Sequence, residues 1–258
     1  MTIYLPARTR KSVLQSYREV AQSGELHNLT GRGADTGRTE KVIRALAALA
    51  NVAPGETVAD IGCGDARFLA SLSGIARQRF GSAISADEVD LLRRHHPAGI
   101  DFAVVDIAAS GLTSKYDVMV LAGTLHLLGT DARASAALRN MAASLTPSGR
   151  LVISDLPSGA RQPKIYQNVL RAWLYVLRAR GLGYALAYAG FLARHRNRWG
   201  QFVVPLTRRW AADETKMAIL AANAGLAIVK SETMFDRTGD KLDAVDGRRN
   251  YVLRGINS

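Results

Sequence analysis

Short apolar stretches alternate along the chain with stretches whose apolar residues recur at helical spacing. The apolar stretches that fit β-strands are residues 58–61, 81–85, 100–105, 116–122 and 149–154. Helical patterns lie mostly between them, as at residues 87–95, and another precedes the first strand at residues 40–50. Strands separated by helices favour a parallel sheet with helices on both faces. The pattern therefore predicts a doubly wound α/β fold.

The first predicted strand runs directly into a glycine turn, in the sequence VADIGCGDARFLASL of residues 58–72. Gly62 and Gly64 remove side chains where a ligand approaches the backbone or where φ must be positive. The following apolar residues have helical spacing, so the first amides of that helix would face whatever the turn holds. A purely structural turn uses the same residues, and the turn alone leaves both interpretations open.

Several separate motifs together resemble the class I S-adenosylmethionine-dependent methyltransferases, from about Lys41 to the C-terminus with one large interruption. DIGCGDA resembles the family's acidic-x-Gly-x-Gly-x-Gly loop, with Ala66 in place of the third glycine. IDFAVVDIA resembles the segment whose acidic residue, here Asp106, contacts the adenine amino group. YDVMVLAGTLHLL resembles the fourth strand and its loop, and LTPSGRLVISD the turn into strand five. ETKMAILAANAGLAIVKSE and RNYVLRGI resemble the last helix and the terminal hairpin.

The resemblance implies a Rossmann-like, mostly parallel sheet of seven strands, with S-adenosyl-L-methionine as the methyl donor. It places the cofactor contacts in the loops that follow the first four strands. The residues concerned are Asp60, Gly62, Cys63, Gly64, Ser85, Asp87, Asp106, Ile107, Ala122 and Thr124.

One position departs from the family pattern. The family usually ends strand two with an acidic residue that holds both ribose hydroxyls, and this chain has Ser85 there, with Asp87 two residues later. Either Asp87 binds the ribose from the start of the helix or Ser85 donates a weaker hydrogen bond, and we favour Asp87. Alternatively, one of the two simply caps the helix at residues 87–95.

A nicotinamide-binding enzyme also places a glycine loop after its first strand. Its Gly-x-Gly-x-x-Gly fingerprint requires a glycine where this chain has Arg67. The spacing therefore favours a methyltransferase, and a nicotinamide-binding or non-catalytic protein of similar fold remains an alternative.

The formal net charge of +12 comes largely from one segment. Residues 161–210 contain ten Lys or Arg and no Asp or Glu, which leaves 24 basic and 22 acidic residues elsewhere. The same segment holds all three tryptophans and interrupts the family resemblance. We therefore predict an N-terminal helix and lid segment at 1–40, a methyltransferase core at 41–158 and 211–258, and a basic, aromatic-rich helical cap at 159–210.

The predicted cap combines apolar and positively charged surfaces. Its first part has an apolar helical stripe that includes Tyr166 and Trp173, opposed by basic residues every seven positions. The uncharged residues 181–193 are too few to span a bilayer but suit an interfacial helix. An insertion after strand five tends to cover the ligand-binding edge of the sheet, so we expect it to recognise an anionic acceptor or an anionic membrane surface. A helical pair with solvated arginines is the plainer alternative.

Nucleic acid is an unlikely partner for the basic segment. The loop AGTLHLLG lacks the Asp or Asn, proline and aromatic residues typical of enzymes that methylate base amines. Cys63 is the only cysteine and lies in the cofactor loop, so it is not placed as a nucleophile, and no disulfide framework or zinc cluster can form. Methylation of RNA ribose stays a weak alternative.

Methyl transfer from a sulfonium requires alignment, and a base where the acceptor is a hydroxyl or ammonium group. His126, in the loop after strand four, and Asp155, just past strand five, are the catalytic candidates. A packing role for His126 and a cap or turn before Pro157 for Asp155 are the alternatives. In the N-terminal segment, Tyr17 or His27 could close over the site as part of a lid, or the segment is uninvolved.

These observations favour a methyltransferase that acts on an oxygen or nitrogen of a small anionic or amphipathic acceptor. We expect it in the cytoplasm, because the N-terminus lacks the apolar stretch of a secretory signal. The alternative is a peripheral membrane methyltransferase of a lipid or lipid-linked glycan.

Overall fold

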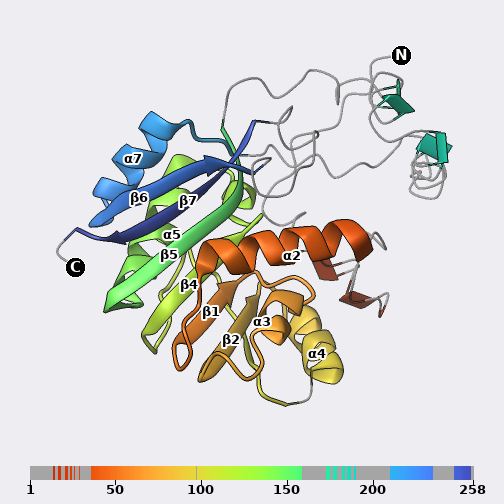
Figure 1. Ribbon diagram of the computed structural model, residues 1–258, viewed down its shortest axis with the longest axis horizontal. Helices are drawn as coiled ribbons and strands as arrows, with labels where there is room; N and C mark the ends of the chain where they lie inside the picture. Colours follow the sequence, from red (N-terminus) through yellow and green to blue (C-terminus); the bar gives the residue numbers. More distant parts are fainter. Residues whose placement is uncertain are drawn as a thin grey trace.

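The computed structural model describes residues 36–96, 98–158, 210–234 and 247–256, with isolated residues between 14 and 29 and between 173 and 189. Seven strands form one sheet in the order β3-β2-β1-β4-β5-β7-β6 (Figure 1). They are β1 (Thr57–Ile61), β2 (Gln78–Ala83), β3 (Asp101–Val104), β4 (Tyr116–Ala122), β5 (Leu145–Pro157), β6 (Leu226–Thr233) and β7 (Arg248–Gly255). β1 to β5 are parallel, and β7 pairs antiparallel with β5 and β6. The predicted Rossmann-like, mostly parallel sheet is confirmed.

Helices cover both faces of this sheet. α2 (Thr36–Ala50), α3 (Arg67–Ser71) and α4 (Ala86–His95) pack on one face, and α5 (Asp131–Ala143) and α7 (Glu214–Ala222) pack on the other. A separate hydrophobic core fills each face. In β4, Val118 and Val120 belong to the core under α2, α3 and α4, whereas Met119 and Leu121 belong to the core under α5 and α7. Because side chains alternate across a strand, each buried strand contributes to both cores. This explains why the strands read as continuous apolar runs.

Two strands differ from the sequence pattern in their boundaries. β2 ends at Ala83 rather than at the predicted 85, because Ser85 begins the next helix as its N-cap. β5 extends from Leu145 to Pro157 rather than from 149 to 154, so Asp155, predicted just past this strand, lies within it. Tyr116 pairs with Leu145 while Val118 pairs with Arg150, so residues 146–149, the predicted turn, form a bulge within the strand.

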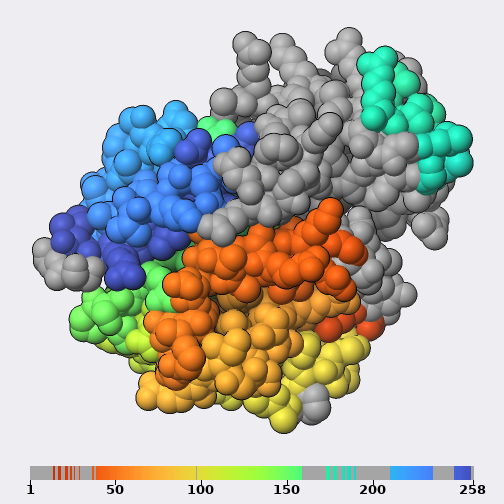
Figure 2. Space-filling model, viewed as in Figure 1, coloured from red at the N-terminus to blue at the C-terminus, as the bar shows by residue number. Residues whose placement is uncertain are grey.

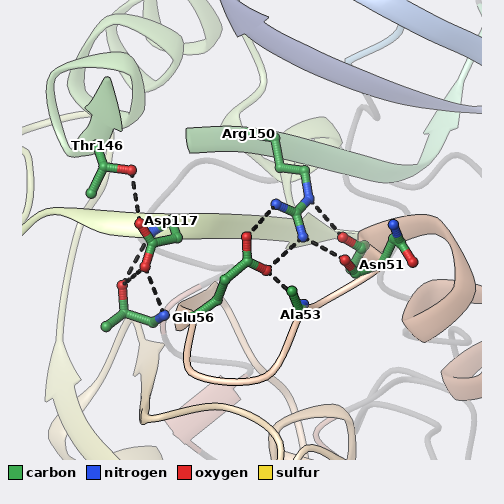
Figure 3. A network of polar contacts seen from close by, with 8 residues as sticks. Asn51, Ala53, Glu56, Asp117, Thr146 and Arg150 are labelled. Atoms are coloured by element: carbon green, nitrogen blue, oxygen red, sulfur yellow. Dashed lines mark hydrogen bonds and ion pairs between the residues drawn. The ribbon is translucent and has the colours of Figure 1, made fainter. Parts of the chain in front are cut away.

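A buried arginine ties the amino ends of the parallel strands together (Figure 3). Arg150 donates hydrogen bonds to the carbonyl oxygens of Ala50 (2.8 Å) and Asn51 (2.6 Å) at the end of α2. It also pairs with both carboxylate oxygens of Glu56, each at 2.8 Å. This hydrogen bonding lowers the pKa of Glu56. The network connects α2, β1 and β5 at the edge opposite to the one where ligands bind in such sheets.

The N-terminal segment and the predicted cap are described only at isolated residues. Ala21 and Leu29 are buried against Leu91 of α4. His27, one of the two proposed lid residues, lies outside the described residues, as does most of the predicted cap at 159–210. Among the helices that are described, none has the length and apolar character needed to cross a bilayer.

Candidate cofactor and acceptor site

The loop after β1 is built from three left-handed residues. Gly62, Gly64 and Ala66 have φ values of 72°, 57° and 56°, alternating with residues of ordinary conformation. Glycine adopts this conformation freely, whereas a residue with a Cβ is disfavoured there by about 1 kcal/mol. Ala66, buried at the N-cap of α3, therefore keeps the backbone of a glycine loop although it is not a glycine. α3 itself is only five residues long.

Gly62 lies where the loops after β1 and β4 touch. A Cβ on Gly62 would lie 2.6 Å from Oγ1 of Thr124, so only glycine fits without displacement. The amide of Cys63 donates to the carbonyl oxygen of Ser82 on β2 at 3.0 Å, which holds the loop from the other side. The strand order reverses between β1 and β4. Open α/β sheets bind ligands at such a reversal point, at the carboxyl ends of the strands.

The cofactor loop also contains buried groups that titrate. Asp60, the fourth residue of β1, is 3% exposed. Burial, followed by the negative charge of Asp60, raises the pKa of the Cys63 thiol well above its usual value. A protonated, buried thiol is a poor nucleophile. Cys63 therefore suits packing within the loop.

Ser85 is bonded to its own helix. Its hydroxyl accepts from the amide of Glu88 at 3.3 Å and donates to Oε2 of Glu88 at 2.8 Å, which is a capping box. The Asp87 side chain is 44% exposed and lies 3.7 Å from Arg18. The geometry thus matches the capping alternative for Ser85. Glu88 is a residue that sequence reasoning missed, although the Ser-x-x-Glu spacing signals it.

Burial also affects Glu88. Desolvation raises the pKa of its carboxyl group, and the hydrogen bonds from Ser85 only partly oppose this. Glu88 is therefore a buried acid within the first turn of α4.

The segment after β3 is held by α5. Asp106 Oδ1 lies 2.8 Å from Nη2 of Arg133. The carbonyl oxygen of Ile107 accepts a hydrogen bond from Nδ2 of Asn140 at 2.8 Å. No motif in the sequence signals Arg133 or Asn140, because neither is near Asp106 along the chain.

His126 lies on a short 3₁₀ helix, η2 (Leu125–Leu128), after β4. It is buried, and glycines with positive φ, Gly123 and Gly129, flank the helix. Ala122 ends β4, and its carbonyl oxygen accepts from the Thr124 hydroxyl at 3.3 Å. His126 is thus placed at the carboxyl end of β4, as the sequence predicts.

Asp155 lies at an irregularity in β5 and has a φ of 63°. Its carboxylate pairs with Arg248, and its amide donates to Oδ1 of Asn250 at 3.2 Å. A Cβ on Gly123 would lie 3.3 Å from Asp155 Oδ2, so this carboxylate faces the loop that leads to His126. Arg248 and Asn250 were missed because β7 is more than ninety residues away in sequence.

The structure therefore brings together the loops after β1 and β4 and the irregular end of β5 through two close approaches, Gly62 to Thr124 and Gly123 to Asp155. Ser85, Asp87 and Asp106 follow β2 and β3 along the same edge of the sheet. The left-handed loop, where a Cβ has no room at Gly62, and the carboxylates of Asp60 and Asp106 fit a cofactor with an amino-acid part and an adenosine part.

Comparisons with known proteins agree with this geometry. A family model for a methyltransferase domain matches residues 35–231, well over half of the chain. Among curated proteins, none matches this sequence.

Solved structures of similar fold include three methyltransferases. The TehB-like SAM-dependent methyltransferase of Corynebacterium glutamicum is 16% identical, with a TM-score of 0.57 over 95% of this chain and 99% of that one. The N-methyltransferase NodS of Bradyrhizobium japonicum, in complex with S-adenosyl-L-homocysteine, is 16% identical, with a TM-score of 0.59 over 93% and 98%. Magnesium protoporphyrin IX methyltransferase of Synechocystis, with the same compound bound, is 18% identical, with a TM-score of 0.58 over 96% and 100%.

At these identities the solved structures show the shared fold, and the family model supplies the membership. The chain belongs to the class I S-adenosylmethionine-dependent methyltransferases and uses S-adenosylmethionine as its methyl donor.

Proposed function

We propose that the protein transfers the methyl group to an oxygen or nitrogen of a small acceptor that is anionic or amphipathic. The observation that carries this proposal is the close approach of the loops after β1 and β4 to each other and of the second of these loops to Asp155 in β5. When bound, S-adenosylmethionine supplies a methyl group activated by its sulfonium. A cofactor held by the first loop has the loop after β4, with His126, and the end of β5, with Asp155, beside it.

On the cofactor side, we assign the family's roles to the matching residues. The loop residues Asp60, Gly62, Cys63 and Gly64 would hold the methionine part. Asp106 and Ile107 would contact the adenine, and Ala122 and Thr124 would line the site from β4. For the ribose we assign Asp87 rather than Ser85, because the Ser85 hydroxyl is already bonded to Glu88.

On the acceptor side, Asp155 is held in an unusual conformation. A non-glycine residue with positive φ costs on the order of 1 kcal/mol and persists where its surroundings fix it, often at functional sites. Arg248 and Asn250 fix the Asp155 side chain and amide here. This arrangement supports a role for the Asp155 carboxylate in orienting the acceptor. His126, on the loop whose Gly123 approaches Asp155, is the candidate base, because imidazole exchanges protons near neutral pH.

The preference for an anionic acceptor comes from the basic segment between β5 and α7. Trp210 donates a backbone hydrogen bond to the carbonyl oxygen of His126 at 2.9 Å, and Ala212 to that of Pro157 at 3.1 Å. The segment thus rejoins the core beside both catalytic candidates. Residues 161–210 contain ten basic and no acidic side chains, and such a field concentrates anions nearby.

The experiment measures methyl transfer from radiolabelled S-adenosylmethionine to hydroxybenzoates and aminobenzoates and to their methyl esters. We expect transfer to the carboxylates in preference to the uncharged esters. Equal or better transfer to the esters would contradict the anionic preference. Asp155→Asn and His126→Gln should each lower the transfer rate by about 100-fold while leaving the affinity for S-adenosylhomocysteine unchanged. Parallel loss of that affinity would contradict an acceptor-side role.

A second candidate function, methylation at an anionic membrane surface, is favoured by exposed leucines. Leu182 and Leu186 are 60% and 59% exposed and lie one helical turn apart. Leu174 and Arg178 are exposed as well, and Trp173 bonds to the carbonyl oxygen of Ala185 at 2.9 Å. The described residues of 173–189 lie at the periphery of the molecule in Figure 2. Apolar side chains within a positively charged segment suit the surface of an anionic bilayer.

Cosedimentation with phosphatidylglycerol or phosphatidylcholine vesicles tests this second candidate. The double variant Leu182→Ser/Leu186→Ser should bind phosphatidylglycerol vesicles about tenfold more weakly than the wild type. The matched control is Ile219→Ser/Val229→Ser, which changes side chains of similar exposure, 57% and 55%, on α7 and β6. Equal losses in both double variants, or equal binding to phosphatidylcholine, would contradict a membrane role.

A further inference from the structure

Two polar side chains of α5 contact the segment that follows β3. Arg133 pairs with the Asp106 carboxylate at 2.8 Å, and Asn140 donates to the carbonyl oxygen of Ile107 at 2.8 Å. Arg133 and Asn140 are seven residues apart, which places them on one face of the helix. Two points of the same short segment, one side chain and one backbone carbonyl, are therefore held by α5.

The contact from Arg133 differs in kind from the one made by Asn140. Asn140 holds the backbone, whereas Arg133 holds the functional group of Asp106. The second torsion of an aspartate side chain has a broad minimum, so an unpaired carboxylate turns readily. A charge-assisted hydrogen bond from a guanidinium restricts this rotation. The Arg133 side chain is 27% exposed and that of Asp106 is 17% exposed, so water screens the pair only in part.

We propose that Arg133 is a positioning residue for recognition of the cofactor's adenine. It fixes the orientation in which the Asp106 carboxylate accepts a hydrogen bond from the adenine amino group. The proposal rests on the assignment of Asp106 to the adenine under the proposed function. It predicts that Arg133 controls discrimination between bases, beyond its effect on affinity.

Discrimination can be measured with two ligands that differ at one group. S-adenosylhomocysteine carries the 6-amino group, a donor, whereas S-inosylhomocysteine carries a 6-oxo group, an acceptor that a fixed carboxylate repels. Calorimetric titration of the full chain with each ligand gives the ratio of the two dissociation constants. We expect the wild type to prefer the adenine ligand by about 100-fold or more, as sites built to pair with a polar group do.

In Arg133→Ala, the carboxylate of Asp106 loses the guanidinium that restricts its rotation, so repulsion of the 6-oxo group weakens and the ratio should fall about tenfold. Asn140→Ala is the matched control, because it removes a contact to the same segment without touching Asp106. It should weaken the binding of both ligands by the same factor and leave the ratio of their dissociation constants unchanged. An unchanged ratio in Arg133→Ala would overturn the positioning role.

Asp106→Asn separates this proposal from the assignment on which it rests. An amide can turn to donate to a 6-oxo group, so this variant should lose the discrimination. If Asp106→Asn retains the wild-type ratio, Asp106 does not read the adenine and the underlying assignment fails. If Asp106→Asn loses the ratio while Arg133→Ala keeps it, only the positioning role fails.

Discussion

At the scale of single residues, the carboxyl edge of the sheet contains residues with a positive φ, a backbone conformation that is unfavourable for any residue with a Cβ. Among the described residues, three that are not glycine have positive φ, and two of them, Ala66 and Asp155, lie at this edge. Ala66 continues the glycine loop after β1, and Asp155 faces the loop after β4. At both residues the tertiary structure imposes a φ value that the residue type disfavours. Such strained residues are expected at ligand-binding loops.

Gly62→Ala tests the loop. The substitution should reduce affinity for S-adenosylhomocysteine at least tenfold, because the new Cβ would lie 2.6 Å from the Thr124 hydroxyl and force the two loops apart. Gly74→Ala is a matched control, with a φ of 77° and no atom within 4 Å of the added Cβ. Both variants should lose about 1 kcal/mol of stability from backbone strain, and Gly74→Ala should bind normally. Calorimetry and denaturant titration separate the two effects, and equal binding losses would rule out a role for the loop.

Glu88→Gln tests the buried acid. Because burial raises the pKa of Glu88, the folded state releases this proton at higher pH than the unfolded state. The glutamate therefore destabilises the fold progressively as pH rises above about 4.5. Glutamine keeps the capping box, so the variant should be more stable than the wild type at pH 7 and equal to it near pH 3. Melting temperatures across this range, without cofactor, give the difference, and a variant less stable at neutral pH would contradict the argument.

At the scale of elements, the two edges of the sheet are built differently. The amino edge is held by direct, mutually bonded side chains around Arg150 and Glu56 (Figure 3). The carboxyl edge is formed by loops, with glycines of positive φ at Gly62, Gly123 and Gly129. The hydrogen-bonded network holds the start of β1 against β5, and in such folds the loops at the other edge carry the binding and catalytic residues.

Arg150→Lys probes the amino edge. Lysine has three donors on a single nitrogen and cannot replace the four hydrogen bonds that three nitrogens of Arg150 make, so the free energy of unfolding should fall by about 3 kcal/mol. Cofactor affinity should change little, because the network lies away from the ligand edge. Arg139→Lys is the control, since Arg139 is exposed and bonds to Ser135 within α5. Chemical denaturation of both variants measures this, and a similar small loss in each would show that the network contributes little.

At the scale of the whole molecule, the end of the basic segment joins the core at the loop after β4 and at α5. Trp210 is buried, its indole donates to Asp131 on α5 at 2.5 Å, and the Lys216 ammonium lies 5.1 Å from its ring centroid. α5 thus contacts the end of the segment through Asp131 and the residues after β3 through Arg133. The proposed cofactor and acceptor regions would therefore share one supporting helix.

Cofactor binding should therefore stabilise the whole core. At a free concentration 100 times its dissociation constant, S-adenosylhomocysteine should raise the free energy of unfolding by about 2.7 kcal/mol. NADH at the same concentration should have no effect, because Arg67 stands where a nicotinamide-binding loop needs glycine. Thermal denaturation with each ligand makes the comparison, and stabilisation by NADH alone would contradict the cofactor assignment.

Much of the fold could be predicted from the sequence because its signals are local. Periodicity located β1, β3 and β4 to within a residue, and the glycine loop lies within a few consecutive positions. The predicted end of β2 was wrong because Ser85, which fits a strand pattern, caps α4 instead. The site residues that were predicted belong to motifs with a known site role. Arg133 and Arg248 belong to no motif, and Asn250 lies in RNYVLRGI, whose resemblance gave it only a strand position.

The sequence by itself determined the order of strands and helices, the methyltransferase family and its cofactor, since these depend on spacing within short segments. Only the tertiary structure decided which side chains hold the acidic residues of the site. Arg133 reaches Asp106 across 27 positions, and Arg248 reaches Asp155 across 93. Such pairs depend on which strands and helices lie side by side, and the pairing of strands distant in sequence is set by the packing of both cores rather than by any local pattern.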